Sequence, residues 1–179
     1  MARYGMLLNT RRCIGCFACR LACQMANEVP SDTSFIRYTG LESGTYPEVK
    51  AEQVMTQCQH CEDAPCVHVC PTGASHINAD GVVLIDTTRC IGCRYCVVAC
   101  PYDARVIDKD AGVAEKCSFC VFTDDGSVPQ PNCERTCVTR ARIFGDLDDP
   151  ESDISKAIVK FNAKPLAGEL TKSKFFYVR

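Results

Sequence analysis

The sequence has no excess of charge of either sign and no long apolar run. It carries 20 Lys and Arg against 22 Asp and Glu, a formal net charge of −2. Proteins that bind nucleic acid usually have a clustered basic face, so this balance argues against nucleic acid as a partner. No stretch approaches the roughly 18 apolar residues that a membrane-spanning helix needs. The longest candidates, such as Val82–Ile85, have the length of a strand, so we expect no membrane span in this chain.

Signals for export and catalysis are also missing. The N-terminal stretch MARYGMLLNT has neither a secretory apolar core nor a cleavage site. Arg11-Arg12 leads directly into Cys13, so we interpret it as a charged flank of a cysteine loop and not as a twin-arginine signal. The sequence contains no glycine-rich nucleotide loop, no catalytic triad and no open metal-site motif. We therefore expect a chain that is soluble, carries no export address and is not an enzyme by itself.

Cysteine, by contrast, is abundant. Sixteen cysteines make up about 9% of the 179 residues, a level that otherwise suggests a secreted disulfide scaffold. Their spacing argues against that class, because they form four blocks of four and none is left over. Such quartets are what [4Fe–4S] cubanes need, and assembly requires a compartment that keeps the thiols reduced. Zinc is the alternative metal, since paired CxxC motifs also make four-thiolate zinc sites.

The clearest run is CIGCRYCVVACP at residues 90–101. Three cysteines spaced C-x2-C-x2-C are followed after three residues by a fourth cysteine and a proline. This is the bacterial ferredoxin run, in which three thiolates bind one cubane and the fourth binds a second. The third cysteine and the trailing CP favour iron–sulfur over zinc. In chain order the quartets are Cys13, Cys16, Cys19 and Cys23; Cys58, Cys61, Cys66 and Cys70; Cys90, Cys93, Cys96 and Cys100; and Cys117, Cys120, Cys133 and Cys137.

The other three quartets vary around this run. In the first, Gln24 replaces the proline, so the next segment can continue as a helix. The second has four residues, ending in Pro65, before its third cysteine. The fourth has a gap of twelve residues in which Asp124-Asp125-Gly126 predicts an exposed loop, and Val138 replaces the proline. Every quartet keeps its four thiols, so these changes alter loops and not ligands.

The ferredoxin rule also predicts which cysteines share a cluster. Quartets two and three are adjacent and joined by a hairpin, so they should form one pair, the inner pair; quartets one and four then form the outer pair. Within each pair the fourth cysteines are exchanged. The four predicted ligand sets are Cys58, Cys61 and Cys66 with Cys100; Cys90, Cys93 and Cys96 with Cys70; Cys13, Cys16 and Cys19 with Cys137; and Cys117, Cys120 and Cys133 with Cys23.

The predicted fold is α+β and loop-rich: two interleaved bacterial-ferredoxin-like units with short β-hairpins and helices. The outer unit is 1–26 plus 102–149 and the inner unit is 58–101, with 27–57 as an insertion that covers clusters or meets a partner. Residues 150–179 form a C-terminal helix and tail.

Periodicity and turn residues predict the elements. We expect strands at 4–8, near 35–36 and 54–55, and at 82–85, with hairpin turns at 78–81 and 108–112. A helix should open near Pro150 and reach about Asn162. The final KFFYVR is strand-like and should pack back on the domain; a strand that docks to a partner is the alternative.

Histidines and cations near the quartets have two interpretations each. His60 and His68 either donate hydrogen bonds to cluster sulfur or are polar groups on the loop surface, and we favour the surface. His76 receives no role. Four cations near ligands either raise cluster potentials or are solvated surface charges: Arg94, Arg105, Lys109 and Lys116.

These motifs resemble the four-cluster, ferredoxin-type beta subunits of the dimethyl sulfoxide reductase superfamily of molybdopterin enzymes. The segments that carry the resemblance are RRCIGCFACRLAC, CQHCEDAPCVHVCPTGA, RCIGCRYCVVACPYDAR, KCSFC and FGDLDDPES. The compact length and PTGAS followed by DGVVLID are most similar to polysulfide, thiosulfate and arsenate reductase small subunits. The resemblance implies a large partner with a molybdenum or tungsten bis-pterin cofactor, and often a quinone-linked membrane anchor. It also implies a location in the cytoplasm, or in the periplasm by export together with that partner.

We therefore expect a non-catalytic subunit that relays electrons through a row of four [4Fe–4S] clusters. A free-standing polyferredoxin shuttle is the first alternative. An enzyme in its own right is the second, disfavoured because complete ligand sets leave no iron open to substrate.

Overall fold

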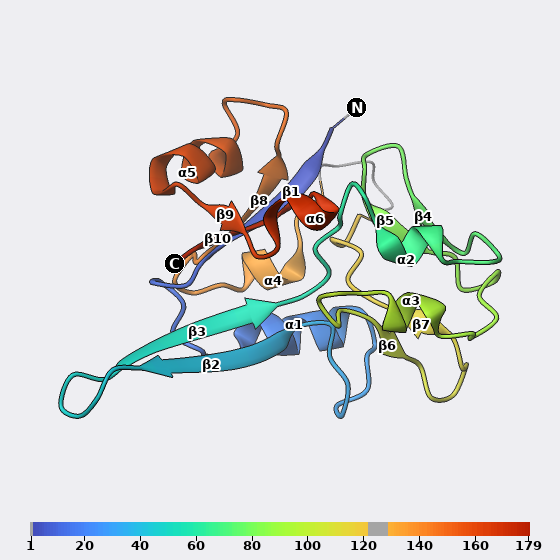
Figure 1. The fold of residues 1–179 in the computed structure, drawn as a ribbon, viewed down its shortest axis with the longest axis horizontal. Coiled ribbons are helices and arrows are strands. Elements are labelled where there is room, and N and C mark those ends of the chain that lie inside the picture. The colour runs from blue at the N-terminus through green and yellow to red at the C-terminus, as the bar shows by residue number, and fades with distance from the viewer. Residues whose placement is uncertain (1, 122–128) are drawn as a thin grey trace.

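A four-stranded sheet lies at the centre of the fold, in the computed structural model that describes residues 2–121 and 129–179. Its strand order is β8-β1-β10-β9. The strands are β1 (Tyr4–Asn9), β8 (Arg142–Asp146), β9 (Lys164–Pro165) and β10 (Phe175–Val178). β1 pairs antiparallel with β8 and parallel with β10, so the first strand lies between two segments from the far end of the chain (Figure 1).

The two faces of this sheet pack against different groups. Leu7 points towards Ile154 and Ala157 of helix α5 (Asp153–Phe161). Its neighbours Met6 and Leu8 point the other way, into the main core that contains the cysteines of the outer pair. This alternation along β1 is what a strand with both faces covered requires. The sheet therefore supports the cysteine loops on one face and α5 on the other.

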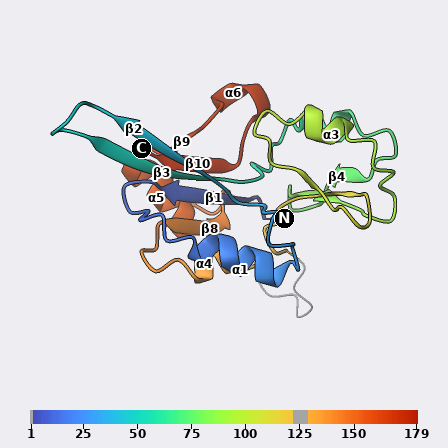
Figure 2. The same ribbon diagram turned by 90° about the horizontal axis from the view of Figure 1, so that it is seen from below.

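Three antiparallel hairpins complete the strands. The long hairpin of β2 (Arg37–Ser43) and β3 (Lys50–Thr56) projects from the body, at the lower left of Figure 1, and every residue of β2 is exposed. The short hairpins β4–β5 (Ser75–Ile77 and Val83–Ile85) and β6–β7 (Val106–Ile107 and Ala114–Glu115) lie at the opposite side. The view from below shows the same separation (Figure 2).

Four short helices follow the cysteine loops: α1 (Ala18–Ala26), α2 (Pro65–His68), α3 (Tyr95–Val98) and α4 (Asn132–Arg135). A further short helix, α6 (Gly168–Thr171), precedes β10. α5 begins at Ser152, whose side chain caps it by accepting a hydrogen bond from Ser155 N. It ends at Asn162, which has the left-handed conformation common at helix ends.

Most of the expected elements are confirmed. Strands occupy 4–9, 83–85 and 50–56, the turns at 78–81 and 108–112 join short hairpins, and α5 covers the predicted helix. KFFYVR packs back on the domain as β10. Phe35 and Ile36, expected in a strand, instead form a buried bend before β2, because Ser34 Oγ bonds both the N–H and the carbonyl of Ile36. The predicted loop at Asp124-Asp125-Gly126 lies outside the described residues.

The described residues include no helix that is long and apolar enough to cross a membrane.

One observation bears on the bounds of the predicted units. Ile107 and Ala114 of the β6–β7 hairpin pack with cysteines of quartets two and three, although we assigned residues from 102 onward to the outer unit.

Candidate metal centres

Each cysteine quartet enters a short helix at its third cysteine. The third cysteines lie on α1, α2, α3 and α4, at Cys19, Cys66, Cys96 and Cys133. α1 is longer than the others and also carries the fourth cysteine of its quartet, Cys23. This agrees with the expectation that the chain continues as a helix where Gln24 replaces proline.

The two CIGC loops have the same backbone. Gly15 and Gly92 have φ values of 65° and 67°, and Phe17 and Arg94 are also left-handed, at 60° and 65°. A Cβ atom at Gly92 would lie 2.5 Å from the carbonyl oxygen of Gly112, so only glycine fits there. The repeated geometry explains how loops far apart in the sequence present their thiols in the same way.

The helices that carry the third cysteines contact one another in two pairs. α1 packs against α4, and α2 packs against α3. Quartet one is therefore brought beside quartet four, and quartet two beside quartet three. This is the partnership that the ferredoxin rule predicts for the outer and inner pairs.

Two of the predicted ligand sets line one cavity each. Cys23 lies with Cys117, Cys120 and Cys133 around one cavity. A second cavity is lined by Cys70 together with Cys90, Cys93 and Cys96. In both cavities the fourth cysteine comes from the other quartet of the pair.

In the remaining two predicted sets, neighbouring thiols affect one another's acidity. Burial, with the neighbouring thiols of Cys58, Cys66 and Cys100, raises the pKa of Cys61 to about 11. The first set behaves similarly: burial raises the pKa of Cys13, and the thiols of Cys19 and Cys137 raise it further. Cys16, the fourth member of that set, is exposed.

All sixteen cysteines are free thiols. Among the described residues, no group of three or more His, Cys, Asp or Glu side chains is arranged to hold a single metal ion. Thiolates that bind a [4Fe–4S] cube each contact a different iron, so they lie farther apart than four ligands of one zinc ion.

Comparison with known proteins identifies the family. The 4Fe-4S dicluster domain family matches residues 49–147, more than half of the chain, including quartets two to four. The protein belongs to this family. It is 40% identical to a protein of Halobacterium salinarum named as the iron-sulfur subunit of a dimethyl sulfoxide reductase, over 94% of this chain and 76% of that protein. The expected resemblance is thus confirmed.

Two further relatives are named as parts of other reductases. The thiosulfate reductase electron transfer subunit of Salmonella typhi is 44% identical, over 83% of this chain and 79% of its own length. A polysulfide reductase chain of Wolinella succinogenes is 37% identical, over 98% of this chain and 94% of its own length. The protein is therefore an iron–sulfur electron-transfer subunit of a reductase and not a catalytic one.

In this member of the 4Fe-4S dicluster domain family, hydrogen-bond donors lie beside several cysteine sulfurs. The fourth cysteines of three quartets each accept a backbone N–H from a residue four or five positions later. The donors and distances are Ser75 to Cys70 at 3.4 Å, Ala104 to Cys100 at 3.5 Å and Ala141 to Cys137 at 3.2 Å. Burial alone would raise the pKa of Cys70, but the Ser75 N–H, the Thr72 hydroxyl and the neighbouring backbone N–H groups hold it below its ordinary value. Donors of this kind stabilise the thiolate that binds iron.

The inner and outer pairs approach each other at Cys58 and Cys117. Burial, followed by the neighbouring thiols, Cys58 among them, raises the pKa of Cys117 well above its ordinary value. Phe119, whose N–H donates to Cys117 Sγ at 3.4 Å, stacks on His60 with 3.7 Å between ring centres. An aromatic pair thus fills the junction between the two pairs.

His60 corrects one expectation. We placed it on the loop surface, but its side chain is 0% exposed because it is covered by Phe119. Among the described residues neither ring nitrogen has a hydrogen-bond partner. Burial, with the cations Lys116, Lys174 and Arg105, lowers its pKa well below the ordinary value. The surface interpretation is right for His68, which is exposed and lies 3.2 Å from the Asp63 carboxylate.

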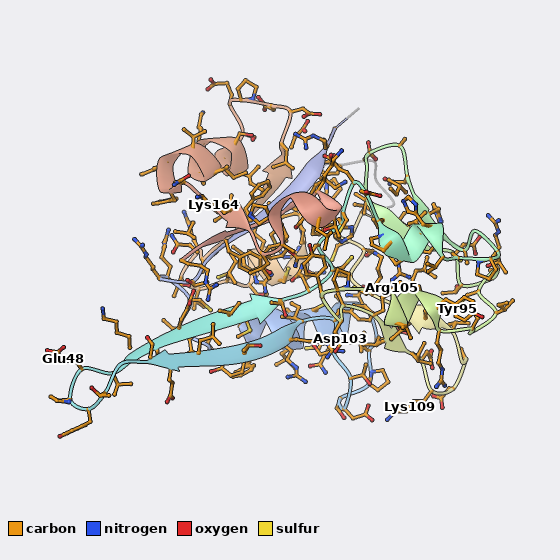
Figure 3. The ribbon with its side chains drawn as sticks, viewed as in Figure 1. Glu48, Tyr95, Asp103, Arg105, Lys109 and Lys164 are labelled. Atoms are coloured by element: carbon orange, nitrogen blue, oxygen red, sulfur yellow. The ribbon has the colours of Figure 1, made fainter. Side chains whose placement is uncertain are left out.

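The four cations divide evenly between surface and interior. Arg94 and Lys109 are exposed, and Lys109 pairs with Asp32. Arg105 and Lys116 are buried, so the surface interpretation is wrong for them. Figure 3 shows Arg105 inside the β4–β7 region and Lys109 at its lower edge. The charged groups of both buried residues donate hydrogen bonds to other groups of the chain. Lys116 Nζ donates to Cys117 O at 2.5 Å, and Arg105 donates to Ser75 Oγ at 2.7 Å.

Sequence reasoning missed three buried polar residues. Arg142 donates to Gln57 Oε1 at 2.7 Å, and Gln57 Nε2 donates to Cys117 Sγ at 3.4 Å. Gln59 bonds the Gln57 carbonyl at 2.8 Å and the Tyr177 hydroxyl at 3.2 Å. Arg142 could have been found by its position, five residues after a fourth cysteine, as Arg105 is. The two glutamines carry no such signal, because their burial depends on distant segments: Gln57 contacts Arg142 of β8, and Gln59 contacts Tyr177 of β10.

Proposed function

We propose that this subunit relays electrons through four [4Fe–4S] clusters for a reductase whose catalytic subunit holds a molybdenum or tungsten bis-pterin. The clusters would be bound by the four ligand sets that exchange their fourth cysteines. The pairing of α1 with α4 and of α2 with α3 carries this proposal, since it brings together the quartets that must share ligands. We also propose that the inner unit extends through the β6–β7 hairpin, to residue 115.

The residues around the thiols fit such a group. Burial raises the pKa of the thiols of Cys13, Cys61 and Cys133, which disfavours the free thiolates, and a positively charged metal would stabilise the ionised form. Buried Arg105 and Arg142 each have a guanidinium nitrogen without a hydrogen-bond partner among the described residues. Cluster sulfides would supply acceptors for these nitrogens. When bound, the clusters accept and donate single electrons at potentials that the surrounding chain sets.

Three effects between thiols of different sets support an order for the row. Cys66 of quartet two raises the pKa of Cys96 of quartet three, and both belong to one buried cluster. Cys58 raises the pKa of Cys117 within the main core. Cys19 raises the pKa of Cys133 in the same core. The sets therefore follow one another from the Cys90 loop through quartets two and four to the Cys13 loop.

The ends of the row are where partners would approach. Cys16 and Cys93, in the two terminal loops, are the exposed cysteines. We propose that the catalytic subunit docks at one end and a quinone-linked membrane subunit or another redox partner at the other. The compartment would be that of the catalytic subunit, in the cytoplasm or, by export together, in the periplasm.

Iron content tests the cofactor. Protein purified without oxygen should hold about sixteen irons and about sixteen sulfides, four of each per cube. Zinc in place of iron, or a quarter of this iron, would refute the proposal.

Double variants test which cysteines share a cluster. C58A and C100A should each remove one cluster, and C58A/C100A should remove no more, leaving about twelve irons. C58A/C70A should remove two clusters and leave about eight, because these cysteines belong to different sets. The reverse result would mean that each quartet binds its own cluster without exchange.

Chromatography of a native extract tests the subunit role. The protein should elute with a large partner that contains molybdenum or tungsten. Elution alone would favour a free polyferredoxin shuttle.

A further inference from the structure

Two buried arginines hold equivalent positions in the sequence. Arg105 follows the fourth cysteine of quartet three, Cys100, by five residues, and Arg142 follows Cys137 of quartet four by five. Each is only 3% exposed. Each thus comes from the later quartet of its pair.

The side chain of Arg105 is close to the third cysteines of the inner pair. It lines one cavity together with Cys96 of α3, and its charge lowers the pKa of both Cys96 and Cys66 of α2 against the effect of burial. Its Nη2 donates to Ser75 Oγ at 2.7 Å. Ser75 is the residue that stands five positions after Cys70, so the two equivalent positions of the inner pair meet. Nη1 has no partner among the described residues.

Arg142 repeats this arrangement in the outer pair. Its Nη1 lies 3.8 Å from Cys133 Sγ on α4, and the sulfur of Cys19 on α1 is close enough to raise the pKa of the guanidinium. The same Nη1 donates to Gln57 Oε1 at 2.7 Å and lies 3.3 Å from Met6 Sδ. Nη2 has no partner among the described residues. Each arginine therefore acts on the third cysteines of two different ligand sets.

Within residues 2–121 and 129–179, no carboxylate forms an ion pair with either guanidinium. The ion pairs found in the described part of the chain involve other residues, most of them at the surface. Burial alone would lower the pKa of Arg142, but the sulfurs of Cys133 and Cys19 raise it above its ordinary value. A buried cation without an anion is strongly unfavourable, so a compensating negative charge belongs at each position.

We propose that Arg105 and Arg142 are the positioning charges of the inner and outer pairs, each shared by the two clusters of its pair. The inference rests on the proposed function. A cube with four thiolates carries net negative charge, so two neighbouring cubes repel each other, and each added electron increases the repulsion. A fixed cation between them offsets this repulsion and makes reduction of both cubes easier. One arginine therefore raises two potentials together.

Arg105 and Arg142 are buried, whereas some other cations near the cysteines are exposed. Arg94 adjoins Cys93 and carries the same charge, but its side chain is exposed. Water and salt screen its field, whereas a buried charge beside two sets acts through protein alone. R94Q is therefore the matched control for R105Q.

The test is a potentiometric titration of the protein purified without oxygen, followed by paramagnetic resonance. Glutamine in R105Q and R142Q keeps a hydrogen-bonding side chain and removes the charge; R105K and R142K keep the charge and remove the planar fork. R105Q should lower two of the four midpoint potentials, and R142Q should lower the other two. R105K and R142K should lie nearer to the wild type, and R94Q should match it.

Each result decides the proposal. It is overturned if R105Q or R142Q, with full iron, leaves all four potentials unchanged, or if the lysine variant shifts them as far as the glutamine variant. If R105Q fails to retain iron, R105K decides: restored iron supports a required charge, and continued loss shows that the guanidinium shape matters instead. A wild-type protein with no reducible clusters would refute the proposed function itself, which is a different outcome from unchanged potentials.

Discussion

Replacement of Phe119 by alanine should release the clusters faster. Phe119 is fully buried at the junction between the inner and outer pairs. Its ring stacks on His60 at 3.7 Å and meets Phe144 edge-on at 5.2 Å. No other aromatic ring in the described residues joins those two neighbours.

The magnitude follows from burial. A Phe→Ala change in a packed core costs about 3–5 kcal/mol. Some of this loss appears in the unfolding rate and some in the folding rate. If between half and all of a ~3 kcal/mol loss appears in the unfolding rate, that rate rises about 10- to 150-fold.

The assay is the decay of the visible iron–sulfur absorbance at fixed temperature without oxygen. A rate is the proper measure, because cluster loss makes unfolding irreversible. F161A is the control, since Phe161 is 39% exposed at the end of α5 and its loss should change the rate little. A decay of F119A within twofold of F161A would show that the junction does not hold the pairs together.

Two other predictions concern α4 and α5. Burial raises the pKa of Glu134, so the folded protein binds the proton of this carboxyl group more tightly than the unfolded protein does. The protein therefore loses stability as pH rises from the ordinary pKa of glutamate through the raised value. E134Q, whose amide oxygen can still accept the Phe144 N–H, should therefore slow cluster loss at pH 7.5, and its advantage should shrink towards pH 5; an advantage that grows in acid would contradict this sign. S152A should destabilise the fold by about 1 kcal/mol, because the hydroxyl caps α5 and donates to the Asp146 carbonyl at 2.7 Å. The rate of cluster loss in S152A against S31A, an exposed serine, tests that cost, and equal rates would show that the cap is not needed.

The sequence by itself determined the metal chemistry and the partnership of the quartets. Thiolate spacing is a local property, because the loop from Cys90 to Cys96 can only fold around a group of a certain size. Local signals also predicted β1, the short hairpins and α5. The family followed from the same motifs, and the comparisons confirm it.

Tertiary structure alone decided which polar groups are buried beside the sulfurs. Nothing local in CQHC shows that His60 is buried, because Phe119, which covers it, lies fifty-nine positions later in the chain. Gln57 and Gln59 are buried by contacts with Arg142 and Tyr177, from the C-terminal part of the chain. The spacing of the cysteines in each loop follows from the covalent chain. The burial of His60, Gln57 and Gln59 depends on distant segments that come together only when β8 and β10 pair with β1. The sequence therefore indicates iron–sulfur binding, and the fold determines which charged and polar groups lie beside the cysteines.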